Sequence, residues 1–142
     1  MRLIETLKQN NYKTVSIIGL AKNAGKTVTL NYLIEEADNL NIKTGITSTG
    51  RDGENTDLVT QTQKPSILVT EGMYVATAKK TLMLSNAKTE ILETTGISTA
   101  MGEVIIVRVR QRGNIQIAGP VSTTDMKYVA GRLKYYGAEV VF

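Results

Sequence analysis

The sequence predicts an α/β fold in which helices flank a mostly parallel β-sheet. Near the amino terminus, the apolar run 15–18 is followed by a loop containing glycine and lysine at 19–27, and then by a helical pattern. Near the carboxyl terminus, a helical pattern at 123–136 separates two short apolar segments, as parallel strands require. A chain of 142 residues can bury a core without disulfides, so we expect a single domain.

Composition excludes several classes of enzyme. The chain has no Cys, His or Trp, which removes thiolate nucleophiles, Ser-His-Asp triads and Cys/His zinc sites. Lys, Arg, carboxylates and hydroxyls remain, and these are the groups that phosphoryl transfer with a bound metal uses. The net charge of +4 is dispersed along the chain, so no nucleic-acid surface is expected. Without a membrane-spanning run or a signal peptide, we expect a soluble, cytoplasmic protein.

The elements of the first half follow from the spacing of apolar residues. A short helix at 3–7 precedes a strand at 14–18, and a second strand is expected at 43–48. Between the two strands, the helix that follows the loop has a buried stripe at i, i+3, i+4 and i+7: Leu30, Leu33, Ile34 and Ala37. Asn39 and Asn41 are expected to end this helix.

The segment 64–76 has two interpretations. Two apolar runs flank Glu71 and Gly72 as strands flank a tight turn, which favours a β-hairpin insertion. The alternative is one buried strand that ends at Glu71, with this acid serving a metal. Pro65, together with the immediate return of apolar residues after the glycine, favours the hairpin.

The run 103–109 is ambiguous because its β-branched residues favour a strand, whereas Ser98 or Thr99 could cap a helix there and Gly113 could end it. Topology decides between the two. Parallel strands expected on either side, at 89–94 and 114–118, need a crossover connection. We therefore predict a helix at 99–112.

The last third of the chain contains the best-marked helix. A capping box at 122–125 begins it, Gly137 ends it, and its span is predicted as 123–136. A final strand at 138–142 follows, and a short helix is expected earlier in the chain, at 77–85.

The loop after the first predicted strand has the residue types of a phosphate-binding loop. In such loops the backbone N–H groups surround the phosphates, and the positive end of the following helix adds to the attraction. Gly25 allows close backbone approach, Lys26 can reach the β- and γ-phosphates as the catalytic residue, and Thr27 can bind Mg²⁺. The predicted nucleotide-binding residues are Gly19, Lys22, Asn23, Ala24, Gly25, Lys26, Thr27 and Val28.

The spacing of this loop differs from the common pattern. Five residues separate Gly19 from Gly25, where the common pattern has four. This gap resembles the phosphate loop of dethiobiotin synthetase and its relatives, P-loop nucleotide hydrolases and kinases with a Rossmann-like three-layer fold. The resemblance implies ATP with Mg²⁺ as the ligand and a homodimer as one expected assembly. Lys22 stands one position too close to Lys26 to match the lysine that reaches across the dimer in a related variant.

Four small polar segments follow predicted strands, and ligands bind outside the carboxyl ends of strands in open α/β sheets. The segments are 19–27, 49–54, 94–96 and 118–122. We expect them to form one site. Asp52 is the first candidate to join Thr27 on the metal, ahead of Glu54 and Asp57, although each acid could instead be a solvated loop residue. The candidates for contact with a second substrate are Thr49, Gly50, Arg51 and Glu54.

Residues 17–27, 47–54 and 117–120 together resemble one known family. It is the P-loop reactivase subunit associated with the adenosylcobalamin-dependent lysine 5,6-aminomutase and its ornithine-acting relatives. The resemblance implies ATP hydrolysis that drives exchange of damaged cobalamin on the mutase, with Lys26 and Thr27 holding the phosphates and Mg²⁺. The chain stops within a strand pattern, so we expect it to be the amino-terminal part of a longer protein.

Two other functions remain open on the sequence. The first is an ATP-dependent ligase or kinase that acts on a small molecule, as dethiobiotin synthetase does. The second is a nucleotide-responsive binding module without turnover. The expected partners are a nucleotide and an aminomutase or second subunit, without nucleic acid or membrane.

Overall fold

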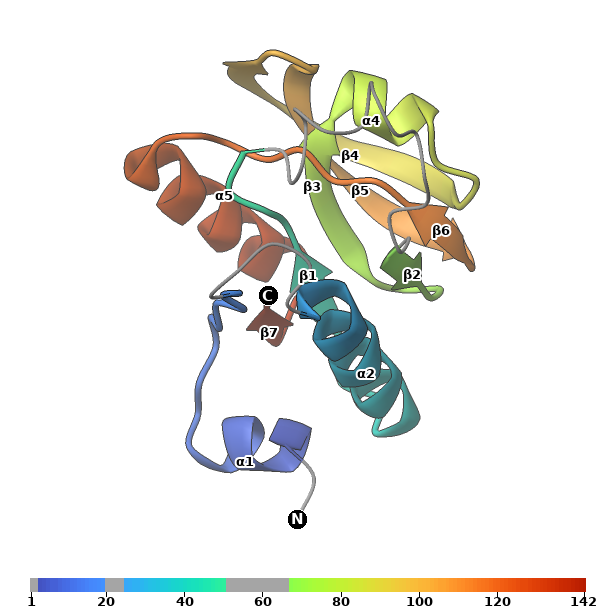
Figure 1. Cartoon of the computed structure of the whole chain (residues 1–142), viewed down its shortest axis with the longest axis vertical. Helices are drawn as coiled ribbons and strands as arrows, with labels where there is room; N and C mark the ends of the chain where they lie inside the picture. Colours follow the sequence, from blue (N-terminus) through green and yellow to red (C-terminus); the bar gives the residue numbers. More distant parts are fainter. Residues whose placement is uncertain (1–2, 20–24, 51–66) are drawn as a thin grey trace.

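A mixed five-stranded β-sheet is the centre of the fold (Figure 1). The computed structural model describes residues 3–19, 25–50 and 67–142. The strands, in order across the sheet, are β4 (Lys88–Thr99), β5 (Gly102–Gln111), β3 (Tyr74–Ala78), β1 (Thr44–Ile46) and β7 (Val140–Val141). β1 is parallel to β3 and β7, whereas β5 is antiparallel to β3 and β4. The α/β class is confirmed, but the sheet is mixed rather than mostly parallel.

Helices pack on both faces of this sheet, because alternate strand residues point to opposite sides. The helices of the described residues are α1 (Leu3–Gln9), α2 (Lys26–Asn39), α4 (Lys79–Met83) and α5 (Thr123–Tyr136). Leu133 of α5 packs with Ala76 and Ile106 in one buried cluster, and Leu33 of α2 packs with Val75 in another. Figure 1 shows α5 and α2 on opposite sides of β1. None of these four helices has the length and apolar character needed to cross a bilayer.

α1, α2 and β1 confirm three of the predicted elements. The predicted strand at 14–18 is wrong beyond its first two residues. Thr14 forms a single parallel bridge with Val141, and the N–H of Val15 donates to the Val141 carbonyl at 2.8 Å. Residues 16–19 have no regular structure. Because β7 is only two residues long, it offers few backbone groups for a longer ladder.

The predicted β-hairpin around Glu71 is wrong, although the turn itself is present. The N–H of Met73 donates to the carbonyl of Thr70 at 3.2 Å. β2 (Ile67–Val69) pairs antiparallel with β6 (Gly113–Ile115) in a separate two-stranded sheet. β3 is hydrogen-bonded on both edges, to β1 and β5, so it has no edge left for β2. Glu71 is exposed, so the alternative of a buried strand ending in this acid is not supported either.

The predicted helix at 99–112 is also wrong, because most of this segment is β5. β4 and β5 are antiparallel neighbours, and such neighbours need only a short turn rather than a crossover helix. Thr99 Oγ1 closes the turn: it accepts the N–H of Met101 at 3.0 Å and donates to the carbonyl of Gly102 at 2.7 Å. Residues 104–107 are buried on both faces of the sheet, which suits their β-branched composition.

α5 has the bounds predicted for the best-marked helix. Ser122 Oγ accepts the N–H of Asp125 at 3.1 Å, and Gly137, with φ of 134°, ends the helix. The predicted final strand is present as the shorter β7. The predicted parallel strand at 114–118 is instead the antiparallel β6, outside the main sheet.

Candidate functional site

α2 begins after an exposed glycine, Gly25. Gly25 lies in the left-handed region with φ of 89°, and its carbonyl accepts the N–H of Thr29 at 3.0 Å. Within the described residues, no side chain caps the first turn of α2, and that turn contains no acid. α5, by contrast, is capped by Ser122 and carries Asp125 in its first turn. The start of α2 therefore suits an external anion.

Lys26 and Thr27 are the first two residues of α2 and are partly buried, whereas Val28 is 66% exposed. Before α2, Thr14 forms an isolated parallel bridge with Val141. Gly19 is partly buried in the part of the loop that the structure describes. The predicted residues Lys22, Asn23 and Ala24 lie outside the described residues.

Two of the other predicted segments meet. The N–H of Gly50 donates to the carbonyl of Pro120 at 3.0 Å, and the N–H of Gly119 donates to the carbonyl of Gly50 at 2.9 Å. The loop after β1 and the loop before α5 are therefore held together through their backbones. Thr49 is exposed within the first of these loops. The expected convergence of these two loops is confirmed.

The segment 94–96 does not follow the end of a strand, contrary to our prediction. It lies inside β4, where the pairing with β5 is irregular. Gly96 has φ of 79° and donates its N–H to Oε2 of Glu103 at 2.7 Å. Thr95 Oγ1 donates to the carbonyl of Val104 at 2.6 Å. The glycine therefore serves a β-bulge, a common reason for glycine inside a strand.

A buried pair of hydroxyls lies at the end of β3, and sequence reasoning missed it. Thr77 Oγ1 lies 2.8 Å from Thr81 Oγ1, and both residues are fully buried. Thr77 Oγ1 also accepts the N–H of Ala118 at 3.0 Å and contacts the carbonyl of Gln116 at 3.2 Å. The signal in the sequence was two threonines four residues apart at a junction of strand and helix. This network holds the loop before α5 against the end of β3.

Comparison of the chain with profiles of known protein families, with characterised proteins and with solved structures found no match. The chemistry of the site therefore rests on the chain's own residues. Those that the structure describes combine a helix start without acids, a lysine and a hydroxyl in the first turn of that helix, and two adjoining polar loops.

The magnesium site predicted from the sequence is only partly within the described residues. Arg51, Asp52, Glu54 and Asp57 lie outside them. Among the residues that are described, no three carboxylates gather into a group able to hold a metal ion. Proteins usually hold Mg²⁺ by one or two side-chain oxygens together with substrate phosphates and water. The hydroxyl of Thr27, in the first turn of α2, fits such a role.

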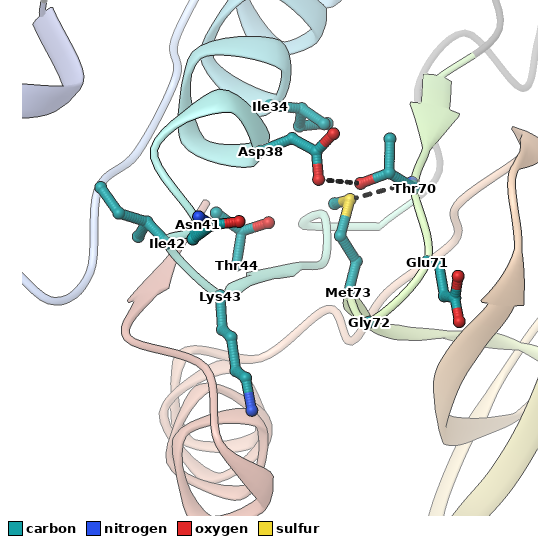
Figure 2. Close-up of a pocket in the computed structure, with 10 residues that line it drawn as sticks. All are labelled: Ile34, Asp38, Asn41, Ile42, Lys43, Thr44, Thr70, Glu71, Gly72 and Met73. Carbon is teal, nitrogen blue, oxygen red and sulfur yellow. Dashed lines mark hydrogen bonds between the residues drawn. The ribbon is translucent and has the colours of Figure 1, made fainter.

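A surface hollow lies at the amino ends of β1 and β3, beside the carboxyl end of α2 (Figure 2). Its lining includes Asp38, Asn41 and Thr44. Thr70 donates its hydroxyl to Asp38 and its N–H to the sulfur of Met73, both at 3.3 Å. The negative end of the α2 dipole and the Asp38 carboxylate both disfavour a phosphate here. This hollow is therefore not the candidate nucleotide site.

The shifted pKa values belong to ion pairs and hydrogen bonds that join elements of the fold. Hydrogen bonds from Arg132 hold the pKa of Glu93 below its usual value, and the hydrogen bond to Glu93 raises the pKa of Tyr136. The backbone N–H of Lys43 lowers the pKa of Glu139. These contacts link α5 to β4, and the residue before β7 to the residue before β1.

Proposed function

We propose that this chain binds Mg·ATP at the loop before α2 and hydrolyses it. The observation that carries the proposal is the start of α2, where Gly25 is left-handed and, among the residues that the structure describes, neither an acid nor a capping side chain occupies the first turn. Backbone amides at such a helix start attract phosphate oxygens. The absence of His and Cys leaves phosphoryl chemistry with a metal as a class of reaction that these residues support.

The glycines, the lysine and the threonine of the loop have the following proposed roles. Gly19 and Gly25 allow the backbone to approach the phosphates, Lys26 neutralises charge on the β- and γ-phosphates, and Thr27 binds Mg²⁺. The remaining nucleotide-binding residues are Lys22, Asn23, Ala24 and Val28. Asp52 completes the metal site, and the loop after β1 faces the transferred phosphate or a second substrate.

The proposed biological role rests on the resemblance to the aminomutase reactivase subunit. In this role, hydrolysis drives the exchange of damaged cobalamin on a cytoplasmic partner enzyme. Two of the three resembling segments, 47–54 and 117–120, contact each other through Gly50, Gly119 and Pro120. That contact supports a shared site for these segments, and the partner itself stays a prediction.

Calorimetric titration of Mg·ATP tests the binding step. Lys26→Ala should weaken binding by about 30-fold or more, because a phosphate contact loses its charged partner. Lys88→Ala, at the exposed start of β4, is the matched control and should bind as the wild type does. Equal affinity in the wild type and Lys26→Ala would overturn the proposal.

ATP turnover tests the biological role. We expect slow hydrolysis that rises when purified lysine 5,6-aminomutase carrying damaged cobalamin is added. A ligase or kinase would instead form product only with a small acceptor molecule. Measurable binding with no turnover under any condition would favour the binding module without catalysis.

A further inference from the structure

A threonine hydroxyl without a hydrogen-bond partner lines the hollow beside the carboxyl end of α2 (Figure 2). It belongs to Thr44, the first residue of β1, which is 2% exposed. Among the residues that the structure describes, no donor or acceptor contacts this hydroxyl. A buried hydroxyl normally has a hydrogen-bond partner, because leaving it without one costs free energy. This hydroxyl is therefore a polar group that a ligand in the hollow would satisfy.

The charges near this hydroxyl favour a cation. The hollow lies beside the negative end of the dipole of α2, and the last turn of this helix carries no basic side chain. Asp38, in that turn, lines the hollow, and its Oδ1 accepts the hydroxyl of Thr70 at 3.3 Å. Glu71 adds a second carboxylate to the lining. Because a carboxylate accepts several hydrogen bonds, Asp38 can accept from a ligand as well as from Thr70.

Among the described residues that line the hollow, Lys43 carries the one positive charge, and this charge points elsewhere. Figure 2 shows the Lys43 side chain extending away from Asp38 and Thr44. The pKa of Glu139, before β7, is lowered first by the backbone N–H of Lys43 and, less strongly, by Lys8 and by the charge of Lys43. The field inside the hollow is therefore set mainly by Asp38 and the end of α2.

The remaining lining and the size of the hollow indicate a small aliphatic ligand. Ile34, Ile42 and Met73 contribute apolar side chains, and all three are buried. The volume is about 200 Å³, which is smaller than the pockets that usually hold drug-sized ligands. Within the described part of the chain, no three metal-ligating side chains gather to hold a metal ion. A short alkyl chain that ends in an ammonium group fits these features better than a metal ion does.

We propose that this hollow binds a small primary ammonium compound, with its ammonium group on Asp38 and Thr44 and its alkyl chain on the three apolar side chains. An ammonium group has three N–H donors. The carboxylate of Asp38, the hydroxyl oxygen of Thr44 and the side-chain oxygen of Asn41 are acceptors in the lining. The hollow lies at the opposite end of α2 from the loop proposed to bind ATP, so this proposal does not depend on the proposed function.

An NMR titration of the nucleotide-free protein tests the proposal, with n-butylammonium chloride as the probe and 1-butanol as its uncharged counterpart. We expect the backbone amide resonances of residues 41–44 and 70–73 to shift, with a Kd of about 1 mM for a cation of this size. 1-Butanol should bind about tenfold more weakly, because it forms no charge-assisted hydrogen bond. Equal affinity for the two compounds would overturn the proposal, as would shifts confined to other residues.

Two variants test the residues that would hold the ammonium group. Asp38→Asn removes the charge with little change in volume and should weaken n-butylammonium binding by about tenfold. Thr44→Val removes only the hydroxyl and should weaken binding by about threefold. Glu35→Gln is the matched control, because Glu35 is an exposed acid of α2 outside the lining, and it should bind as the wild type does.

Asp38 is exposed, so Asp38→Asn decides the test if Thr44→Val does not fold. Wild-type affinity in Asp38→Asn would overturn the proposal. A titration with potassium chloride covers the inorganic alternative. Displacement of n-butylammonium by an equal concentration of K⁺, with shifts at the same amides, would assign the hollow to an inorganic cation and would also overturn the proposal.

Discussion

The guanidinium of Arg132 donates from both Nε and Nη2 to a single oxygen of Glu93, Oε1, at 2.8 and 2.6 Å. Tyr136 donates its hydroxyl to the same oxygen at 2.8 Å. The side chain of Glu93 is 17% exposed and that of Arg132 is 30% exposed. Charge-assisted hydrogen bonds with this little solvent contact are stronger than surface ion pairs. This network therefore holds α5 on the edge strand β4.

Glu93→Gln should lower the free energy of unfolding by about 1–2 kcal/mol, because the charged acceptor of four hydrogen bonds, from Arg132, Tyr136 and Tyr128, is lost. Glu90→Gln, on the same strand, is the matched control. Glu90 pairs with Arg110 at 2.8 Å, but their side chains are 45% and 53% exposed, so its loss should have an effect below about 0.5 kcal/mol. Urea denaturation of both variants measures the difference, and equal effects would contradict this prediction.

The contribution of Glu93 should also depend on pH. Its pKa is lowered by Arg132 from the ordinary value of 4.5, so the folded state favours the ionised carboxylate. The stabilisation is then fully present above pH 4.5 and is lost as the pH falls through the lower folded-state pKa. The difference in unfolding free energy between the wild type and Glu93→Gln should shrink across this acid range. If the difference in unfolding free energy between the two proteins stayed constant down to the folded-state pKa of Glu93, this prediction would be wrong.

Gly25→Ala should lower the free energy of unfolding by about 1 kcal/mol, because an L-residue is strained in the left-handed region. A methyl group there meets nothing within 4 Å, so no clash contributes. Gly131→Ala, inside α5, should instead stabilise the protein by about 0.5–1 kcal/mol through helix propensity. Thermal unfolding of the two variants should therefore shift in opposite directions.

Thr27→Val should remove the Mg²⁺-dependent part of ATP affinity, about tenfold, while ATP affinity in EDTA stays close to the wild-type value. Valine keeps the shape of the side chain and lacks only the hydroxyl. Thr29→Val is the control, because Thr29 is exposed on the same helix. Titrations of ATP in Mg²⁺ and in EDTA measure the affinity with the metal and the affinity without it. Equal losses in the two buffers would assign Thr27 to the phosphates rather than to the metal.

Asp52→Asn should weaken Mg²⁺-dependent ATP binding more than Glu54→Gln or Asp57→Asn, because only the first is expected to complete the metal site. Replacement of a carboxylate by an amide removes the charge with little change in volume. A competition titration, with Mn²⁺ as a probe read by electron paramagnetic resonance, ranks the three variants. A larger effect in either of the other two would reassign the metal carboxylate.

Local signals in the sequence were enough for α2 and α5. The stripe of α2 and the capping residue Ser122 of α5 involve neighbours within one or two turns, and both helices are present with these features. The turn at Glu71 was also visible, because it depends on adjacent residues. Which strands pair was not visible, and both the hairpin and the helix at 99–112 failed for that reason.

In the candidate site, too, some features follow from neighbouring residues in the sequence, and others depend on contacts between distant residues. The proposed roles of Gly25, Lys26 and Thr27 come from their order along the chain, and these three residues lie at the start of α2. The bonding of Gly119 to Gly50 joins residues 69 positions apart, and the close approach of Gly119 to the carbonyl of Ser48 arises only from that contact. No pattern near Gly119 encodes its distance from Ser48.

The sequence by itself determined the α/β class, the helices α1, α2 and α5, and the residue types of the loop before α2, because these depend on interactions between close neighbours along the chain. The tertiary structure decided the mixed sheet, the separate pairing of β2 with β6 and the contact between the loops at Gly50 and Gly119. These features depend on which strand edges, distant in the sequence, form hydrogen bonds with each other and bury surface together. The pairing is determined only when the whole chain packs.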